Sequence, residues 1–161
     1  MPRAATRGLA ALAKAGVPHE VVTFEHDPSH RSFGDEAADA LTERGIAREQ
    51  IYKTLVITVT GGLAVAILPV PDRLSLKAAA AALGVPRAGM AEAAAAERAT
   101  GYVVGAISPF GQRKPLPTVL DSSALRWDRI YCSAGRRGWD VAVAPGDLIR
   151  LTGAVTADVC A

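Results

Sequence analysis

The segment IYKTLVITVTGGLAVAILPV, residues 51–70, consists of two runs rich in β-branched and aliphatic residues on either side of Gly61 and Gly62. Two such runs around a two-residue glycine turn are typical of a tight β-hairpin. The second run is apolar on both faces, which predicts a strand near the centre of a sheet. We therefore expect this hairpin to form the middle of the fold.

The hairpin lies in a stretch of uncharged residues that approaches the length of a membrane span. Eighteen uncharged residues separate Lys53 from Asp72. Pro69, Pro71, the two glycines and three threonines favour a hairpin over a membrane helix. The N-terminal apolar stretch is interrupted by Lys14 and predicts a first helix rather than a signal segment. We expect a cytoplasmic protein that does not bind a membrane.

Helices and strands are predicted on both sides of the hairpin. The expected helices cover residues 5–15, about 32–45, 75–83 and 91–98, with a last one from near Pro145; the expected strands cover residues 20–24, 118–120, 130–132 and 140–143. Ser32 and Asp35 have nearly the pattern of a capping box at the start of the second helix. The 161 residues fit one domain, 1–161, of the α+β class.

Composition narrows the possible functions. Half of the residues are apolar and 21% are charged, so the chain should fold into an ordered domain. Aromatic residues are only 5%, which argues against the base-stacking surfaces of single-strand nucleic-acid binders. The net charge is +2, yet residues 111–138 carry six basic groups and two acidic ones, a local charge of +4. This region is either a patch that binds a polyanion or a solvated basic loop.

Lys53 is the charged residue of the first hairpin strand. Side chains alternate in direction along a strand, so Lys53 shares its face with Ile51, Leu55, Ile57 and Val59. A lysine on an apolar face either extends its ammonium group into solvent at the strand end or holds it in a cleft beside a partner. In a cleft it would position an anion or take part in catalysis.

Residues 101–117, GYVVGAISPFGQRKPLP, are dense in glycine and proline and predict a loop. From Gly105 to Pro109 such a loop can present backbone N–H groups to a carbonyl or phosphate oxygen. It matches neither a Walker A motif nor a dinucleotide-binding fingerprint. Ser108 and Ser133 are either nucleophiles or hydrogen-bonding loop serines, and no GxSxG motif surrounds them.

The sequence supplies no clear metal site and implies no cofactor. Cys132 and Cys160 are too far apart for a CxxC pair, and two cysteines cannot form a four-cysteine zinc site. His26 and His30 have the spacing of a helical metal pair, but Pro28 disfavours a helix between them. We expect a turn with solvent-exposed histidines.

Five separated motifs resemble, in order and spacing, the YbaK/EbsC family of aminoacyl-tRNA deacylases. The resemblance extends from about residue 15 to residue 150 and is carried by FEHDP, YKTLV, LAVAILPV, TGYVVGAISPFGQRKPLPTVLD and IYCSAGRRGWD. It implies the fold of the YbaK and prolyl-tRNA synthetase-associated domains, a mixed, barrel-like twisted sheet with surrounding helices.

The resemblance implies an enzyme that acts in trans on the ester between a wrongly attached amino acid and the terminal adenosine of a tRNA. The most similar branch clears Cys-tRNA(Pro), an error of prolyl-tRNA synthetase that arises because cysteine and proline are similar in size. In that branch the substrate thiol attacks its own ester carbonyl to give a cyclic thiolactone, while the protein supplies positioning and charge stabilisation. The implied partners are the acceptor end of aminoacyl-tRNA and, as a candidate, prolyl-tRNA synthetase.

The resemblance also assigns site residues. Lys53 corresponds to the family lysine that contacts the substrate end, and Gly105 to the GxxxP loop that shapes the amino-acid pocket. Ser133 and Asp140 would orient the substrate amine or ribose. These four are the expected catalytic residues. The expected substrate-binding residues are Phe24, Gly101, Ile107, Ser108, Pro109, Gly135 and Arg137.

Three positions depart from the pattern of that branch. Phe24 stands where tyrosine is common and cannot donate a hydrogen bond. Cys132 and Ala134 replace valine and glycine, and an alanine disfavours a turn that needs a positive φ. Strand alternation points Cys132 toward the core, so we expect a structural thiol there.

Two other functions fit the same residues. The first is a deacylase that clears another small amino acid, such as alanine, from tRNA(Pro). The second is a non-catalytic module that binds tRNA or a synthetase; Lys53 and the complete loop argue against it.

Overall fold

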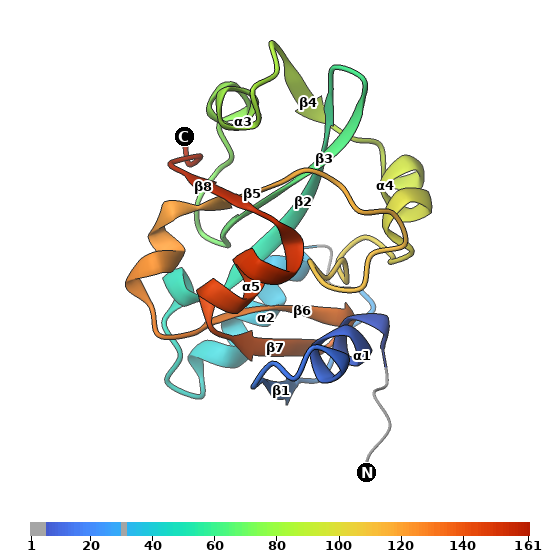
Figure 1. Ribbon diagram of the computed structural model, residues 1–161. Helices are drawn as coiled ribbons and strands as arrows, with labels where there is room; N and C mark the ends of the chain where they lie inside the picture. Colours follow the sequence, from blue (N-terminus) through green and yellow to red (C-terminus); the bar gives the residue numbers. More distant parts are fainter. Residues whose placement is uncertain (1–5, 30–31) are drawn as a thin grey trace.

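The computed structural model describes residues 6–29 and 32–161, and its strands form two β-sheets (Figure 1). The strands are β1 (Glu20–Thr23), β2 (Tyr52–Val59), β3 (Gly62–Pro69), β4 (Ala88–Met90), β5 (Thr118–Asp121), β6 (Ile130–Arg136), β7 (Trp139–Val143) and β8 (Val155–Ala157). The larger sheet has the order β4-β2-β3-β5-β8 and the smaller one the order β1-β7-β6. A bridge between Ile51 and Tyr131 joins the two sheets. The mixed α+β class is confirmed, while the strands divide into two sheets instead of one barrel-like sheet.

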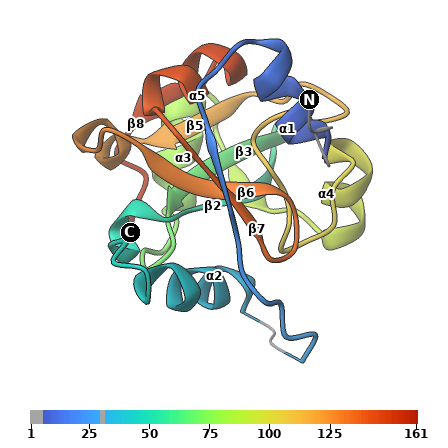
Figure 2. The same ribbon diagram turned by 90° about the horizontal axis from the view of Figure 1, so that it is seen from below.

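Helices cover the outer faces of the sheets and the ends of the molecule (Figures 1 and 2). The α-helices are α1 (Arg7–Lys14), α2 (Phe33–Thr42), α3 (Leu76–Leu83), α4 (Ala93–Thr100) and α5 (Pro145–Thr152), and the short 3-10 helices are η1 (Arg48–Gln50) and η2 (Ser122–Arg126). Figure 1 shows α3 and β4 at the end of the molecule opposite the three-stranded sheet. In the described part of the chain, no helix is both long and apolar enough to cross a bilayer.

The hairpin of residues 51–70 forms, with its two-residue turn at Thr60 and Gly61 instead of the predicted Gly61 and Gly62. β2 and β3 pair antiparallel from Tyr52 opposite Pro69 to Val59 opposite Gly62, and Gly61 adopts φ +89° in the turn. β3 is the middle strand of the larger sheet. Its side chains alternate between two clusters, so both faces are buried, which explains why the run is apolar throughout.

Two clusters of apolar residues lie on the two faces of β3. The main core contains Val65 and Ile67 of β3 together with Cys132 of β6, Leu12 of α1 and Leu148 of α5. The second cluster lies under α3 and contains the alternate residues of β3, Ala64, Ala66 and Leu68. Cys132 is fully buried and burial raises its pKa well above 9.0, as expected for a structural thiol.

The C-terminal half differs from the sequence expectation in its strand lengths. The expected turn at residues 133–138 is shorter, because β6 continues through Arg136 and only two residues separate it from β7. Ala134 lies within β6, and no non-glycine residue in the described ranges has a positive φ, so Ala134 does not occupy a turn that needs one. The short strands β4 and β8 carry too little periodicity to be found from sequence.

Asp121 joins the end of β5 to the C-terminal segment. Its buried carboxylate accepts hydrogen bonds from the backbone N–H groups of Ser123 at 3.2 Å and Val159 at 2.9 Å. Burial favours the neutral acid, but hydrogen bonds from Ser123 and Val159 outweigh it and hold the pKa of Asp121 below 3.8.

We predict that Asp121→Ala lowers the free energy of unfolding by about 2 kcal/mol, because two backbone N–H groups lose their acceptor. Urea unfolding measures this loss. Asp128→Ala, which removes an exposed carboxylate a few residues further on, should change stability by less than about 0.5 kcal/mol. Equal effects of the two substitutions would contradict an anchoring role for Asp121.

Candidate active site

A cavity lies beside an open edge of β2. β4 pairs with β2 only from Ile57 to Val59, and Val56 O accepts a hydrogen bond from Ala91 N at 3.2 Å, so among the described residues no strand pairs with that edge from Tyr52 to Leu55. A cavity of about 510 Å³ opens there. Its walls come from β2, the first turn of α2, the start of α4, the loop after α4, and facing residues of β6 and β7.

The four expected catalytic residues all line this one cavity. Lys53 comes from β2, Gly105 from the loop after α4, Ser133 from β6 and Asp140 from β7. Ser133 lies directly opposite Asp140 in the antiparallel pairing of β6 and β7. Ile107, one of the expected substrate-binding residues, also lines the cavity. The fold therefore brings residues from four separate segments to one place.

Lys53 is held in the cavity wall by backbone carbonyl groups. Its Nζ donates hydrogen bonds to Val70 O at 3.2 Å and to Asp72 O at 2.5 Å. An ammonium group has three N–H donors, so one is left for the cavity. Burial lowers the pKa of Lys53 from 10.5, and the nearby negative charges of Asp35 and Asp72 oppose this shift. The structure thus places Lys53 in a cleft with partners, which is one of its two expected environments.

Asp140 is a buried carboxyl group in the central strand of the smaller sheet. It is 6% exposed and lies between Val22 of β1 and Ser133 of β6. Burial raises its pKa from 3.8 to about 8. At neutral pH most of the Asp140 side chains are therefore protonated, and a cation bound nearby would favour their ionisation.

Gly105 lies against the aromatic ring of Phe33. It adopts φ +89°, and a Cβ atom at this position would lie 2.4 Å from ring atoms of Phe33. Both the backbone conformation and the contact therefore require glycine. Phe33 is the first residue of α2, so this contact fixes the distance between that helix and the loop.

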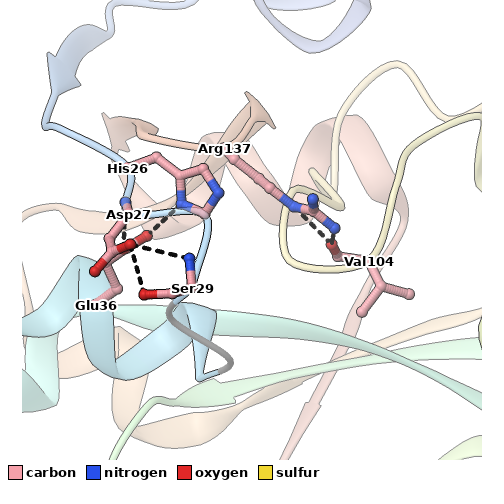
Figure 3. Close-up of polar contacts among 6 residues, drawn as sticks. All are labelled: His26, Asp27, Ser29, Glu36, Val104 and Arg137. Atoms are coloured by element: carbon pink, nitrogen blue, oxygen red, sulfur yellow. Dashed lines mark hydrogen bonds and ion pairs between the residues drawn. The ribbon is translucent and has the colours of Figure 1, made fainter.

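Arg137 contacts both Phe33 and the loop after α4, and Figure 3 shows its bonds to Val104 of that loop. Its Nε and Nη2 donate to Val104 O at 3.2 and 2.7 Å, and its guanidinium lies 4.5 Å from the centre of the Phe33 ring. Phe33 and Val104 line the cavity, whereas Arg137 does not. Arg137 therefore shapes the rim from outside.

Glu36 ties the first turns of α2 to the segment after β1. Its Oε1 lies 2.8 Å from His26 Nδ1, and its Oε2 accepts a hydrogen bond from Asp27 N at 2.9 Å (Figure 3). Glu36 is buried, and the side chain of His26 is 21% exposed. The expected solvent-exposed turn is therefore wrong for His26, which is partly buried and bonded; His30 lies outside the described residues.

The remaining expected residues lie away from the cavity lining. Ser108 is buried and its Oγ accepts a hydrogen bond from Phe110 N at 3.2 Å, a structural role. Pro109 lines a second, smaller cavity of about 190 Å³. The others are Phe24, which is hydrogen-bonded to Gly138 through its backbone; Gly101, which ends α4; and Gly135, whose N–H donates to Ser133 Oγ.

Sequence reasoning missed several residues of the cavity wall. Phe33 and Asp35 belong to the first turn of α2, and only the capping pattern at Ser32 pointed to that turn. The Ser32 hydroxyl donates to Asp35 Oδ2 at 2.7 Å, so the two side chains bond to each other. Thr54 also lines the cavity, and its Oγ1 is the one buried side-chain N or O atom in residues 6–29 and 32–161 that lacks a hydrogen-bond partner. No sequence pattern marked Thr54.

This chain is similar to known aminoacyl-tRNA editing proteins. A family model described as the aminoacyl-tRNA editing domain matches residues 34–151. EbsC of Enterococcus faecalis, named for deacylation of Cys-tRNA(Pro) and Cys-tRNA(Cys), is 32% identical over 96% of this chain and 92% of its own length. The multifunctional Ser/Thr-tRNA deacylase ProXp-y of Escherichia coli is 32% identical over 90% of this chain and 86% of its own.

A solved structure shares the whole architecture. A crystal structure described as a trans-editing enzyme for prolyl-tRNA synthetase superposes with a TM-score of 0.83, covers 100% of this chain and 99% of its own, and is 28% identical. The chain belongs to the aminoacyl-tRNA editing domain family. It is accordingly an aminoacyl-tRNA deacylase, an enzyme that hydrolyses the ester bond of aminoacyl-tRNA.

We predict that Gly105→Ala destabilises the protein by about 2–3 kcal/mol, because it adds backbone strain to a clash with the Phe33 ring. The double variant Gly105→Ala/Phe33→Ala should lose less than the sum of the two single variants, since the ring that clashes is gone. Urea unfolding of all four proteins measures the coupling. Additive losses would show that Phe33 does not constrain Gly105.

We predict that the free energy of unfolding of the wild type falls with rising pH, relative to that of the Asp140→Asn variant. Between pH 4 and about 8 the native carboxyl keeps a proton that the unfolded chain loses. The unfolded state then binds fewer protons, so the difference in unfolding free energy, wild type minus variant, decreases by up to about 1.4 kcal/mol per pH unit. Urea unfolding at pH 4.5, 6 and 7.5 measures it, and a constant difference would contradict the raised pKa.

Proposed function

We propose that this protein clears Cys-tRNA(Pro) in trans, with the cavity beside β2 as the hydrolytic site. The observation that carries the proposal is that Lys53, Gly105, Ser133 and Asp140 all line one cavity. In this proposal residues 1–161 act as one editing domain in the cytoplasm and protect the fidelity of translation. Sequence identity does not distinguish between the possible amino acids, because EbsC and ProXp-y are both 32% identical to this chain.

The proposed reaction uses the thiol of the substrate. The cysteine sulfur attacks the ester carbonyl carbon, a C–S bond forms, and the bond from the carbonyl carbon to the ribose oxygen breaks. The thiol proton ends on the ribose oxygen, so the products are a thiolactone and a tRNA with a free terminal hydroxyl. Water then opens the thiolactone to cysteine. No enzyme nucleophile is needed, and the protein lowers the barrier by position and charge.

Each cavity residue has a role in this proposal. The free N–H donor of Lys53 and a backbone N–H of the Gly105 loop stabilise the negative charge that develops on the carbonyl oxygen. The paired positions of Ser133 and Asp140 orient the ribose end of the substrate. The apolar residues Val56, Ala96 and Ile107 form a cluster at the cavity that excludes water from the amino-acid side chain.

The proposed partner is the acceptor end of aminoacyl-tRNA, and prolyl-tRNA synthetase is the proposed source of the mischarged tRNA. Arg137 lies at the rim of the cavity and is suited to meet the phosphate backbone there. Arg129, from the same basic region, forms an ion pair with Glu20 at 2.9 Å. The side chain of Arg129 is still about half exposed. Binding of tRNA should weaken as salt concentration rises.

We predict that wild-type protein hydrolyses Cys-tRNA(Pro) and leaves Pro-tRNA(Pro) intact, and that Lys53→Ala lowers kcat/KM for the cysteinyl ester by about 100-fold, the usual cost of losing one transition-state donor. Deacylation of tRNA charged with cysteine, serine, alanine or proline measures the selectivity. Lys77→Ala removes an exposed lysine outside the cavity and serves as the control.

Three outcomes would change the assignment. Clearance of alanine or serine in place of cysteine would keep the editing site and replace the substrate. Equal activity of Lys53→Ala and wild type would show that Lys53 does not contribute to catalysis. Protection of every ester at enzyme excess, without turnover, would favour a binding module.

A further inference from the structure

A substrate of this enzyme carries a positive charge that the cavity has to accommodate. The α-amino group of an aminoacyl ester is a cation in the protonated form, and its pKa lies near neutrality. Lys53, a second cation, lines the same cavity. Two like charges in one partly buried site repel each other, so a bound aminoacyl ester needs a carboxylate close to its amine.

Two carboxyl groups line the cavity, Asp35 and Asp140. Asp140 is almost completely buried within the smaller sheet, and an ionised group there lacks the solvation that water would give it. Asp35 is exposed and lies close enough to Lys53 for its charge to act on it. The carboxyl group that water solvates and that faces a ligand in the free enzyme is therefore that of Asp35.

The neighbouring contacts hold Asp35 in this position. The Ser32 hydroxyl donates to Asp35 Oδ2 at 2.7 Å, which restricts the side chain and leaves Oδ1 for a ligand. The next residue, Glu36, bonds to His26 and to the backbone of Asp27 (Figure 3). These bonds fix the rotation of α2, and consecutive helical residues point in directions about 100° apart, so Asp35 faces the cavity while Glu36 faces the loop.

From this arrangement we propose that Asp35 binds the free α-ammonium group of the aminoacyl ester and makes the enzyme selective for esters with an unblocked amine. Esters whose amine is acylated, as in a peptidyl-tRNA, lack this cation and are spared. The proposal builds on the aminoacyl ester as substrate and is independent of the amino-acid side chain, so it goes further than the assignment of cysteine.

The test compares esters that differ only in the amine. We expect Asp35→Asn to lower kcat/KM for Cys-tRNA(Pro) by about 10- to 100-fold, the range for a lost charge-assisted hydrogen bond, and to change hydrolysis of 3-mercaptopropionyl-tRNA(Pro), which has no amine, by less than about twofold. Asparagine still accepts the Ser32 hydrogen bond, so the fold of the first turn is kept. Asp39→Asn, one turn further along α2 and paired with Arg48, is the matched control and should leave both rates unchanged.

Equal losses on the two esters, or no loss on either, would overturn the proposal, because Asp35 would then act on a shared part of the substrate or not at all. A loss of the amine preference in Asp140→Asn with none in Asp35→Asn would assign the ammonium group to Asp140 and would also overturn it. If serine is cleared in place of cysteine, the pair becomes Ser-tRNA(Pro) and 3-hydroxypropionyl-tRNA(Pro), and the Asp35 proposal is tested while the cysteine assignment fails.

A binding measurement separates this proposal from turnover. Cysteine joined by an amide to 3′-amino-3′-deoxyadenosine cannot be hydrolysed as an ester, and its N-acetyl form lacks the cation. Calorimetry should show that wild type binds the free amine at least tenfold more tightly than the N-acetyl form and that Asp35→Asn binds both alike. Equal affinity of wild type for the two analogues would overturn the proposal even if the enzyme turns over Cys-tRNA(Pro).

Discussion

The candidate active site depends on the short pairing between β2 and β4. Three residues of β2 pair with β4, and the edge from Tyr52 to Leu55 stays open beside the cavity in the described part of the chain. On its other side β2 is paired with β3 along its whole length, and β3 is buried on both faces. The open edge is therefore part of a rigid strand, which positions Lys53 without a flexible loop.

The opposite wall is held by contacts among three segments. Phe33 of α2 packs on Gly105, and Arg137 contacts both the Phe33 ring and the carbonyl of Val104. The position of each segment therefore depends on its contacts with the other two. This wall of the cavity is thus assembled by tertiary structure, and small changes at Phe33 should alter the width of the cavity.

The sequence predicted the parts of this site that depend on local patterns. The hairpin of residues 51–70, the buried Cys132 and the loop around Gly105 follow from alternation and from glycine and proline content. The residue pattern alone left Lys53 undecided between solvent and cleft, and the family resemblance favoured the cleft. The carbonyl groups of Val70 and Asp72 that bind it become neighbours only when β2 pairs with β3.

The residues that sequence reasoning missed share a physical reason. Asp35 and Phe33 reach the cavity because α2 has a fixed rotation, which Glu36 sets through bonds to His26 and Asp27. Such long-range contacts leave no periodic pattern in the chain. The division into two sheets was hidden for the same kind of reason, since it depends on which distant strands become neighbours.

The pairing of β1 with β7 affects how the chain folds during synthesis. Glu20 lies opposite Ala142, so the smaller sheet joins residues from opposite ends of the sequence. Non-local pairings of this kind form slowly, because a long loop has to close before any contact is gained. On the ribosome β1 has no partner strand until β7 has emerged, and only then can Asp140 be buried. A nascent chain therefore cannot complete the cavity beside β2 until almost the whole domain has been translated.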